Sequence, residues 1–166
     1  RHLDRRGFGD VAIEVLATTN YWQANSVDGS YFQPATNSIH LRGGEGYDDT
    51  VIGHEHGHFI ARNWSNDDSP GGTHFIGDNL QDIRLSWSEG WATFFAAATR
   101  RAFGREPMAS AYIDTQGGPG PGNLNFSFEL EGPSLPARGA GSELTVGAAL
   151  WDVIDDAATP DPFPGV

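Results

Sequence analysis

Residues 48–64 read DDTVIGHEHGHFIARNW, and they place three histidines and a glutamate at neighbouring positions between apolar flanks. A helix that only packs into a core has no reason to collect three histidines. Because residues four apart lie on one face of a helix, His54 and His58 present two imidazoles side by side. Glu55 lies about 100° around the helix from His54, within reach of a water molecule on an ion held there. His56 points away from this face and is left out of the predicted site.

The order His54, Glu55 and His58 is the H-E-x-x-H arrangement of zinc metallopeptidases. This pattern also arises by chance in unrelated proteins, and a catalytic zinc needs a third protein ligand. In the metzincins that ligand is a further histidine on the same segment, preceded by a glycine. Here the two positions hold Ala61 and Trp64, which excludes that branch.

Glu89 is the predicted third ligand, in the segment LSWSEGWATFFAAATRRA at 85–102. A carboxylate that faces a core costs several kcal/mol unless it has a partner such as a metal ion. The structural alternative is an acid favoured in the first turn of a helix by capping and the dipole. Another acid, such as Asp82, is the alternative ligand. The neighbours of Glu89 bury this turn and favour the metal ligand: Trp87, Gly90, Trp91, Ala92, Phe94 and Phe95.

The composition narrows the class of protein. A chain of 166 residues with 38% hydrophobic side chains fits one domain, which we expect to span residues 1–166. No apolar run approaches the roughly 20 residues that cross a bilayer. The net charge of −12 argues against a nucleic-acid partner, because phosphate binding needs a basic surface. The chain has no cysteine, so any metal must be held by His, Asp or Glu.

The two ends suggest a piece of a longer protein. The chain opens at Arg1 and stops in TPDPFPGV, which is typical of a linker. We therefore expect a mature or excised fragment, and we expect it to be secreted. All ten positive side chains are arginine, a usage that fits a high-GC genome, high salt or an extracellular setting alike.

Helices dominate the expected secondary structure, with one small sheet near the start, so the predicted fold class is α+β. The stretch TQGGPGPGN at 115–123 is too rich in glycine and proline for regular structure. The expected strands are 31–33 and 38–41, around the turn PATN. The expected helices are 11–25 with Asp10 as its cap, about 50–63, Ser86 or Ser88 to Arg101, and about 142–157 with Ser142 as its cap.

With these residues in place, the sequence resembles the gluzincins, the zinc peptidases whose third ligand is glutamate. VIGHEHGHFI at 51–60 resembles their active-site helix, and NSIHLRGGEGYDDTVIGHEHGH at 37–58 is similar to the strand, loop and helix around it. WSEGWATFFAAA at 87–98 is similar to the E-G-W-x-x-F-F-A segment of the fungalysins and the E-G-F-A-T-Y segment of thermolysin-related aminopeptidases. GAALWDVIDD at 147–156 is similar to A-x-x-L-W-D-V of fungalysin-like enzymes. The resemblance covers roughly 30–157 and implies a zincin-like fold.

The chain departs from these families in the residues that surround the ligands. The segment between His58 and Glu89 is longer than the corresponding segment in these families. Where fungalysins and thermolysins support a zinc histidine with an aspartate, this chain has Thr93, which leaves the supporting partner open. Just before the last helix these families carry a histidine that stabilises the tetrahedral intermediate, and PARGAGSEL at 136–144 has none. The candidates for that role are Tyr112, Arg138 and His74.

The predicted function is that of a gluzincin-type zinc peptidase acting on peptides or proteins, an endopeptidase rather than an aminopeptidase. Zinc is held by His54, His58 and Glu89, and Glu55 is the general base. The resemblance implies that the strand at 38–41 receives the substrate as an added β-strand.

Two other functions stay open. One is a catalytically silent zinc-binding or protein-interaction module with the same fold, favoured by the missing histidine. The other is a metal-free helical interaction domain, which would leave Glu55 and Glu89 without a purpose. The aspartate pairs at 67–68 and 155–156 are either a Ca2+ site or a solvated surface. The oligomeric state is not determined by the sequence.

Overall fold

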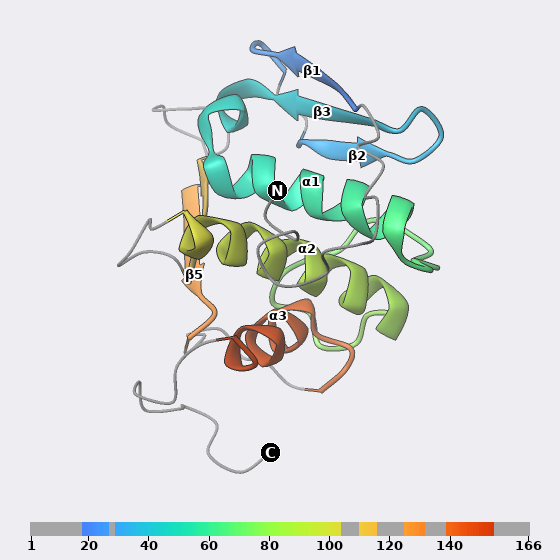
Figure 1. The fold of residues 1–166 in the computed structure, drawn as a ribbon, viewed down its shortest axis with the longest axis vertical. Coiled ribbons are helices and arrows are strands. Elements are labelled where there is room, and N and C mark those ends of the chain that lie inside the picture. The colour runs from blue at the N-terminus through green and yellow to red at the C-terminus, as the bar shows by residue number, and fades with distance from the viewer. Residues whose placement is uncertain (1–17, 27–28, 104–109, 116–124, 132–138, 155–166) are drawn as a thin grey trace, which may run out of the picture.

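The computed structural model describes residues 18–26, 29–103, 110–115, 125–131 and 139–154. Within these ranges the fold is α+β, as predicted, with three α-helices and two small sheets. Figure 1 shows the elements stacked in the order of the first sheet, α1, α2 and α3. None of the described helices is long and apolar enough to span a bilayer.

The first sheet has β3 (Ser38–Arg42) at its centre. β1 (Thr19–Gln23) pairs with it in parallel, and β2 (Tyr31–Gln33) pairs with it antiparallel. The strands predicted at 31–33 and 38–41 are confirmed. The turn between them uses Asn37 at a φ of 52°, a left-handed conformation that asparagine tolerates. Because β3 is paired on both sides, the prediction that it receives a substrate strand is wrong.

The predicted first helix is wrong where the structure tests it. Residues 11–17 lie outside the described residues, and Thr19–Gln23 form β1 instead of a helix. All five residues of this strand are exposed, so Tyr21 and Trp22, the described part of the apolar stripe that suggested a helix, are not buried. β-branched and aromatic side chains favour extended backbone. The ring of Tyr21 stacks on its cross-strand partner His40 at 5.0 Å, which a helix would not allow.

α1 (Asp49–Trp64) packs its apolar face against the first sheet. Ile39 and Leu41 from β3 form a buried cluster with Phe59 of α1, and Phe32 of β2 packs on this cluster. A short 3-10 helix, η2 (Gly43–Tyr47), leads from β3 into α1, where a loop was expected. This packing fixes one face of α1 against the sheet and turns another face towards α2.

α1 and α2 (Ile83–Ala102) approach closely because α1 has glycines on that face. A Cβ on Gly57 would lie 2.7 Å from Cα of Ala92, and one on Gly53 would lie 3.0 Å from Cβ of Ala96. Nε1 of Trp91 also donates a hydrogen bond to the carbonyl of Gly57 at 3.3 Å. Side chains that project from facing turns of the two helices are therefore brought together.

α2 begins earlier than predicted. Its first residue is Ile83, and the side chain of Asp82 caps it by accepting a hydrogen bond from the backbone N–H of Arg84. The prediction placed the start at Ser86 or Ser88. Glu89 therefore lies beyond the first turn of α2, where capping and the helix dipole do not explain a buried acid.

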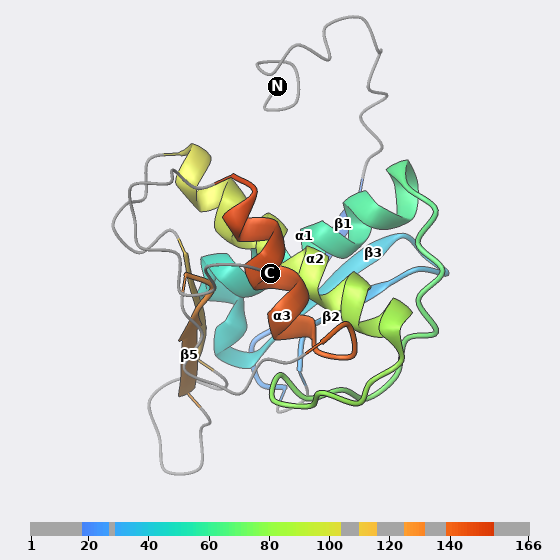
Figure 2. The ribbon, with the colours of Figure 1, turned by 90° about the horizontal axis from the view of Figure 1, so that it is seen from below.

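α3 (Glu143–Asp152) crosses α2 on the side away from the sheet, and Figure 2 shows it in front of α2. The predicted cap is confirmed, because Oγ of Ser142 accepts from the N–H of Thr145. Gly90 allows the close contact: a Cβ there would lie 2.6 Å from the carbonyl oxygen of Glu143. The start of α3 is thus held next to Glu89.

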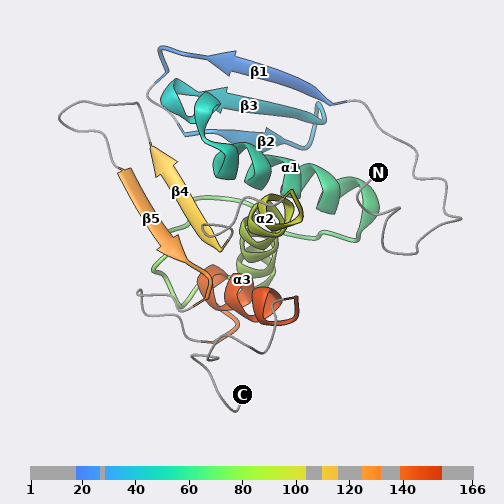
Figure 3. The ribbon, with the colours of Figure 1, turned by 60° about the vertical axis from the view of Figure 1, so that its left-hand side comes forward.

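The second sheet is a hairpin that was not predicted. β4 (Ala111–Thr115) pairs antiparallel with β5 (Asn125–Glu129), and Figure 3 shows the hairpin to one side of the helices. Tyr112 and Phe128 are register partners whose rings stack at 5.1 Å. The N–H of Ile113 donates to Oγ1 of Thr50 at 3.1 Å, which ties the hairpin to the start of α1. Of the stretch predicted to lack regular structure, 115–123, Thr115 ends β4 and residues 116–123 lie outside the described residues.

Candidate metal centre

The structure brings His54, His58 and Glu89 together between α1 and α2. Nε2 of His54 lies 3.1 Å from Oε2 of Glu89, and Nε2 of His58 lies 3.2 Å from the same oxygen. The two Nε2 atoms are 3.1 Å apart. Glu89 is buried, with 7% of its surface exposed. The three atoms form a near-equilateral triangle that can hold one metal ion.

The dimensions of this triangle fit a tetrahedral zinc ion. Ligand atoms at about 2.0–2.2 Å from such an ion are about 3.3–3.6 Å from one another, and the observed separations of 3.1–3.2 Å are close to that value. Two imidazole nitrogens and a carboxylate oxygen are also the ligand types that zinc takes in proteins. When both Nε2 atoms carry no hydrogen, their lone pairs and that of Oε2 of Glu89 repel one another. A cation bound between the three atoms removes this repulsion.

Each histidine of this triangle is supported through its other ring nitrogen. Nδ1 of His54 lies 3.1 Å from Oγ1 of Thr93. Nδ1 of His58 lies 3.4 Å from Oγ of Ser88, which donates to Oδ2 of Asp67 at 3.2 Å. Such partners fix the tautomer and the ring orientation of metal-binding histidines. Thr93 therefore fills the supporting place that the sequence left open, and the pair Ser88 and Asp67 was missed.

The charges of the triangle depend on one another. Burial raises the pKa of Glu89, but hydrogen bonds from His54 and His58 outweigh it and hold that pKa far below its usual range. Burial lowers the pKa of His58, but the hydrogen bond and the charge of Glu89 outweigh this and raise it to about 9. The raised pKa of His58 and the lowered pKa of Glu89 both favour a positive charge beside the Glu89 carboxylate.

Glu55 lies beside the triangle and is itself buried, with 6% of its surface exposed. Burial raises its pKa, and the charges of His54 and His58 oppose that shift. Glu55 lines the same cavity as the three candidate ligands. A buried carboxylate with a raised pKa is suited to accepting a proton near neutral pH.

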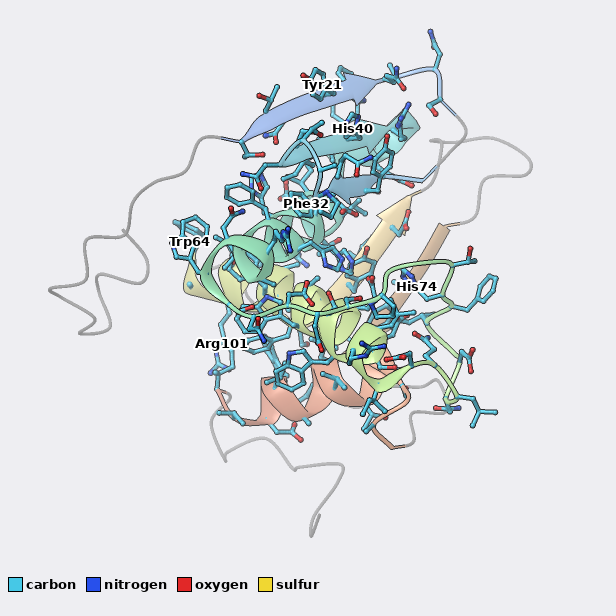
Figure 4. All side chains as sticks on the ribbon, turned by 90° about the vertical axis from the view of Figure 1, so that its right-hand side faces the viewer. Tyr21, Phe32, His40, Trp64, His74 and Arg101 are labelled. Carbon is cyan, nitrogen blue, oxygen red and sulfur yellow. The ribbon has the colours of Figure 1, made fainter. Side chains whose placement is uncertain are left out.

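The cavity over the triangle has a volume of about 880 Å³, within the usual range for ligand sites. One wall comes from β2 and the residues around it, Gly29–Phe32 and Pro34. Another comes from Tyr112, Asp114 and Phe128 of the hairpin, and the α1–α2 loop adds a third. Figure 4 shows that loop, with His74 labelled, passing close to the helices.

Comparison with known proteins gives a family. Residues 12–161 match the family described as Mycolysin C-terminal domain. The chain belongs to this family. This domain family comes from zinc metalloproteases. The match therefore supports the predicted relation of the chain to zinc peptidases as a class.

A further comparison found a similar protein of unassigned function. An uncharacterized protein of Archaeoglobus fulgidus is 29% identical over 136 residues, which cover 81% of this chain and 35% of that protein. The chain thus spans about a third of the length of this relative. No solved structure matches the chain.

Of the three candidates for the missing histidine, Tyr112 and His74 line the cavity. The ring of Tyr112 lies 5.9 Å from that of His54, and burial together with the charge of Asp114 raises its pKa well above the usual value. His74 faces Glu89, with 3.3 Å between Nε2 and Oε2. Arg138 lies outside the described residues.

The remaining candidates lie elsewhere. Asp82 caps α2 and is not among the grouped ligand atoms, so it does not replace Glu89. His56 is likewise outside the triangle and packs near the ring of Phe59. Asp68 pairs with Arg84 at 4.0 Å. Among the described residues, the groups that could hold a metal do not include the 67–68 pair, and 155–156 lies outside these ranges.

Glu143 is a residue of this centre that the sequence reasoning missed. It opens α3, has 4% of its surface exposed, and places Oε2 3.8 Å from Nε2 of His74. Burial raises its pKa, and the charge of His74 opposes that shift. The signal was present in the sequence: an acid at the start of an otherwise apolar helix is the same feature that pointed to Glu89.

Proposed function

We propose that this chain is a zinc-dependent peptidase of the gluzincin type with a zincin-like fold. His54, His58 and Glu89 would hold the zinc ion. The observation that carries the proposal is the triangle of ligand atoms at 3.1–3.2 Å, with a supporting partner on each histidine. Membership of a domain family from zinc metalloproteases supports it.

The chemistry follows from the groups around this triangle. Bound zinc supplies a Lewis acid that lowers the pKa of a water molecule towards about 7 and polarises the scissile carbonyl. Glu55 accepts the proton of the attacking water and returns it to the leaving amine. Tyr112 is the proposed donor to the carbonyl oxygen as that oxygen becomes negative, because it lines the cavity next to His54.

The substrate would bind along β2 rather than β3. β2 is at the edge of the first sheet, and Tyr31, Phe32 and Pro34 line the cavity. An extended peptide that pairs with this edge passes the triangle and continues towards the hairpin β4–β5. A cleft with walls on both sides of the ligands accommodates the middle of a chain, which favours an endopeptidase.

One alternative is that the chain binds zinc but does not hydrolyse peptides. The chain would then be a silent zinc-binding or protein-interaction module of a larger protease-related protein. The missing histidine before α3 favours this alternative. So does the comparison with the longer relative, because the chain covers only 35% of that protein.

The test separates metal binding from catalysis. Purified protein should contain zinc by elemental analysis and should cleave members of a broad peptide library, followed by mass spectrometry. Glu55→Gln should keep its zinc while hydrolysis falls by about 10²–10⁴ or more. Glu129→Gln, a change of the same kind at an exposed strand position, is the matched control.

Two results would count against the proposal. Hydrolysis that survives in Glu55→Gln would place the base elsewhere. Zinc binding without cleavage of any peptide by the unchanged protein would favour the silent module.

A further inference from the structure

A second group of ligand atoms lies next to the triangle and shares one residue with it. His74, Glu89 and Glu143 bring one nitrogen and two carboxylate oxygens within 4.8 Å of one another. We infer that these three residues form a second divalent-cation site, with Glu89 shared between the two ions. This inference goes beyond the proposed hydrolysis, although it rests on Glu89 being a ligand of the first ion.

The orientation of His74 matches that of the two triangle histidines. Its Nδ1 lies 3.3 Å from the carbonyl oxygen of Gly72, so this nitrogen carries the hydrogen that it donates. Its Nε2 faces Oε2 of Glu89 at 3.3 Å and Oε2 of Glu143 at 3.8 Å. A ring nitrogen held by a backbone carbonyl, with the other turned towards carboxylates, is the usual arrangement of a metal-binding histidine.

Glu143 supplies an independent observation. Its side chain is 5% exposed, and Oε2 has no hydrogen-bond partner among the described residues. An acid that served only to cap a helix would accept from the first backbone N–H groups, but at α3 the side chain of Ser142 does this. A buried carboxylate oxygen without a donor is unfavourable unless a cation lies beside it.

The two carboxylates of Glu89 and Glu143 favour the binding of more than one cation. Oε2 of Glu89 faces all three histidines, at 3.1 Å from His54, 3.2 Å from His58 and 3.3 Å from His74. Glu143 adds a second carboxylate on the side of His74. One ion in the triangle leaves Oε2 of Glu143 with only the ring of His74 beside it, and without a hydrogen-bond donor among the described residues. Two ions that share a carboxylate, about 3.5–4 Å apart, are a known arrangement in hydrolytic sites.

The second site is also accessible. The side chain of His74 is 34% exposed, and the residue belongs to the α1–α2 loop at the rim of the cavity (Figure 4). An ion can therefore enter from solvent, while Glu89 and Glu143 hold it from the buried side. One imidazole and two carboxylates suit zinc and similar divalent ions.

The competing explanation is a proton in place of the ion. His74 would then be an imidazolium paired with Glu89 and Glu143, and no second metal would bind. The two explanations differ in the number of ions that the protein takes up.

The experiment counts ions. The full chain is stripped with a chelator, dialysed against zinc at a fixed free concentration, and analysed for zinc per chain. The unchanged protein should bind two ions, whereas His74→Asn and Glu143→Gln should each bind one. His56→Asn and Glu129→Gln change the same residue types outside both groups and should bind two. Circular dichroism checks that each variant is folded.

A second measurement does not depend on any variant. When the unchanged protein is loaded with Co2+, two ions that share the carboxylate of Glu89 should be magnetically coupled. The electron paramagnetic resonance signal per ion should then be weaker than in protein that holds a single Co2+.

The outcomes are distinct from those of the proposed function. A single zinc at saturation, two ions retained in His74→Asn and Glu143→Gln, or two uncoupled Co2+ ions would each overturn the second site. Peptide cleavage with one zinc would overturn it while leaving the proposed peptidase intact. Two coupled ions without any cleavage would support the second site and contradict the peptidase.

Discussion

The hydroxyl of Thr93 lies 3.1 Å from Nδ1 of His54, one helical turn beyond Glu89 on α2. The fungalysins and thermolysins, which the chain resembles, have an aspartate at that position. The shorter side chain still reaches the ring, because glycine at position 57 lets α1 and α2 approach closely. The neutral hydroxyl can hold the histidine in the orientation that points Nε2 towards Oε2 of Glu89, where the proposed zinc ion would bind.

The first prediction concerns this contact. Thr93→Ala should weaken zinc binding by about 10–100-fold, the usual effect of removing a supporting partner. Thr93→Ser keeps the hydroxyl, so its zinc affinity should be close to that of the unchanged protein. Competition with a chromophoric chelator measures the affinity, and Thr99→Ala, on the same helix, is the control. Equal affinity in Thr93→Ala would mean that the contact does not orient His54.

The second prediction tests the proposed donor to the carbonyl oxygen. Tyr112→Phe removes only the hydroxyl and keeps the ring that stacks on Phe128. The kcat for a cleaved peptide should fall by about 10²–10³, whereas zinc content should not change. Tyr47→Phe, at a position that is 77% exposed, is the matched control. A kcat that falls by less than tenfold would assign the role to another donor.

The third prediction concerns the packing that assembles the site. A methyl group at Gly57 would lie 2.7 Å from Cα of Ala92, and this backbone contact cannot move aside cheaply. Gly57→Ala should therefore lower the free energy of unfolding by about 1–3 kcal/mol, measured by urea denaturation of the metal-free protein. Gly77→Ala faces open space and should change it little. Equal stability of the two variants would show that α1 and α2 can separate without cost.

The fourth prediction follows from the charge of the cavity. Its charged lining is mainly acidic, with Arg62 as the arginine among its lining residues. Peptides with lysine or arginine near the cleaved bond should have a higher kcat/KM than matched peptides with glutamate, and added salt should reduce the difference. Asp114→Asn should reduce the ratio of kcat/KM between the basic and the acidic peptides. The control Asp49→Asn, at an exposed position, should leave this ratio unchanged. A preference for acidic peptides would contradict this reading of the cavity. The acidic residues are Glu45, Glu55, Asp67, Glu89, Asp114 and Glu143.

The elements that were predicted well are those whose signal is local. The helix that carries His54 and His58 was expected at about 50–63 and is observed at Asp49–Trp64. Strands β2 and β3 of the first sheet and the Ser142 cap of α3 were also predicted. In each case a turn, a cap or a periodic apolar pattern within a few residues contains the information.

The errors concern pairing between distant segments. β1 was predicted as part of a helix because Tyr21 or Trp22 continues an apolar stripe that starts at Val11. Both aromatic residues are exposed, and the strand forms by pairing with β3. The hairpin β4–β5 was missed since its strands are separated by a glycine- and proline-rich stretch. Strand pairing depends on partners that a local pattern does not reveal.

The sequence by itself determined which residues could act at the site. The spacing of His54 and His58 puts two imidazoles on one face of a helix, and an acid in an apolar segment marked Glu89. These properties belong to single helices and need no knowledge of the fold. Only the tertiary structure decided that Oε2 of Glu89 meets both Nε2 atoms, that Thr93 supports His54, and that His74 and Glu143 converge on the same carboxylate. The physical reason is that these contacts join a loop and three helices, and glycines at the helix crossings set the distances between them.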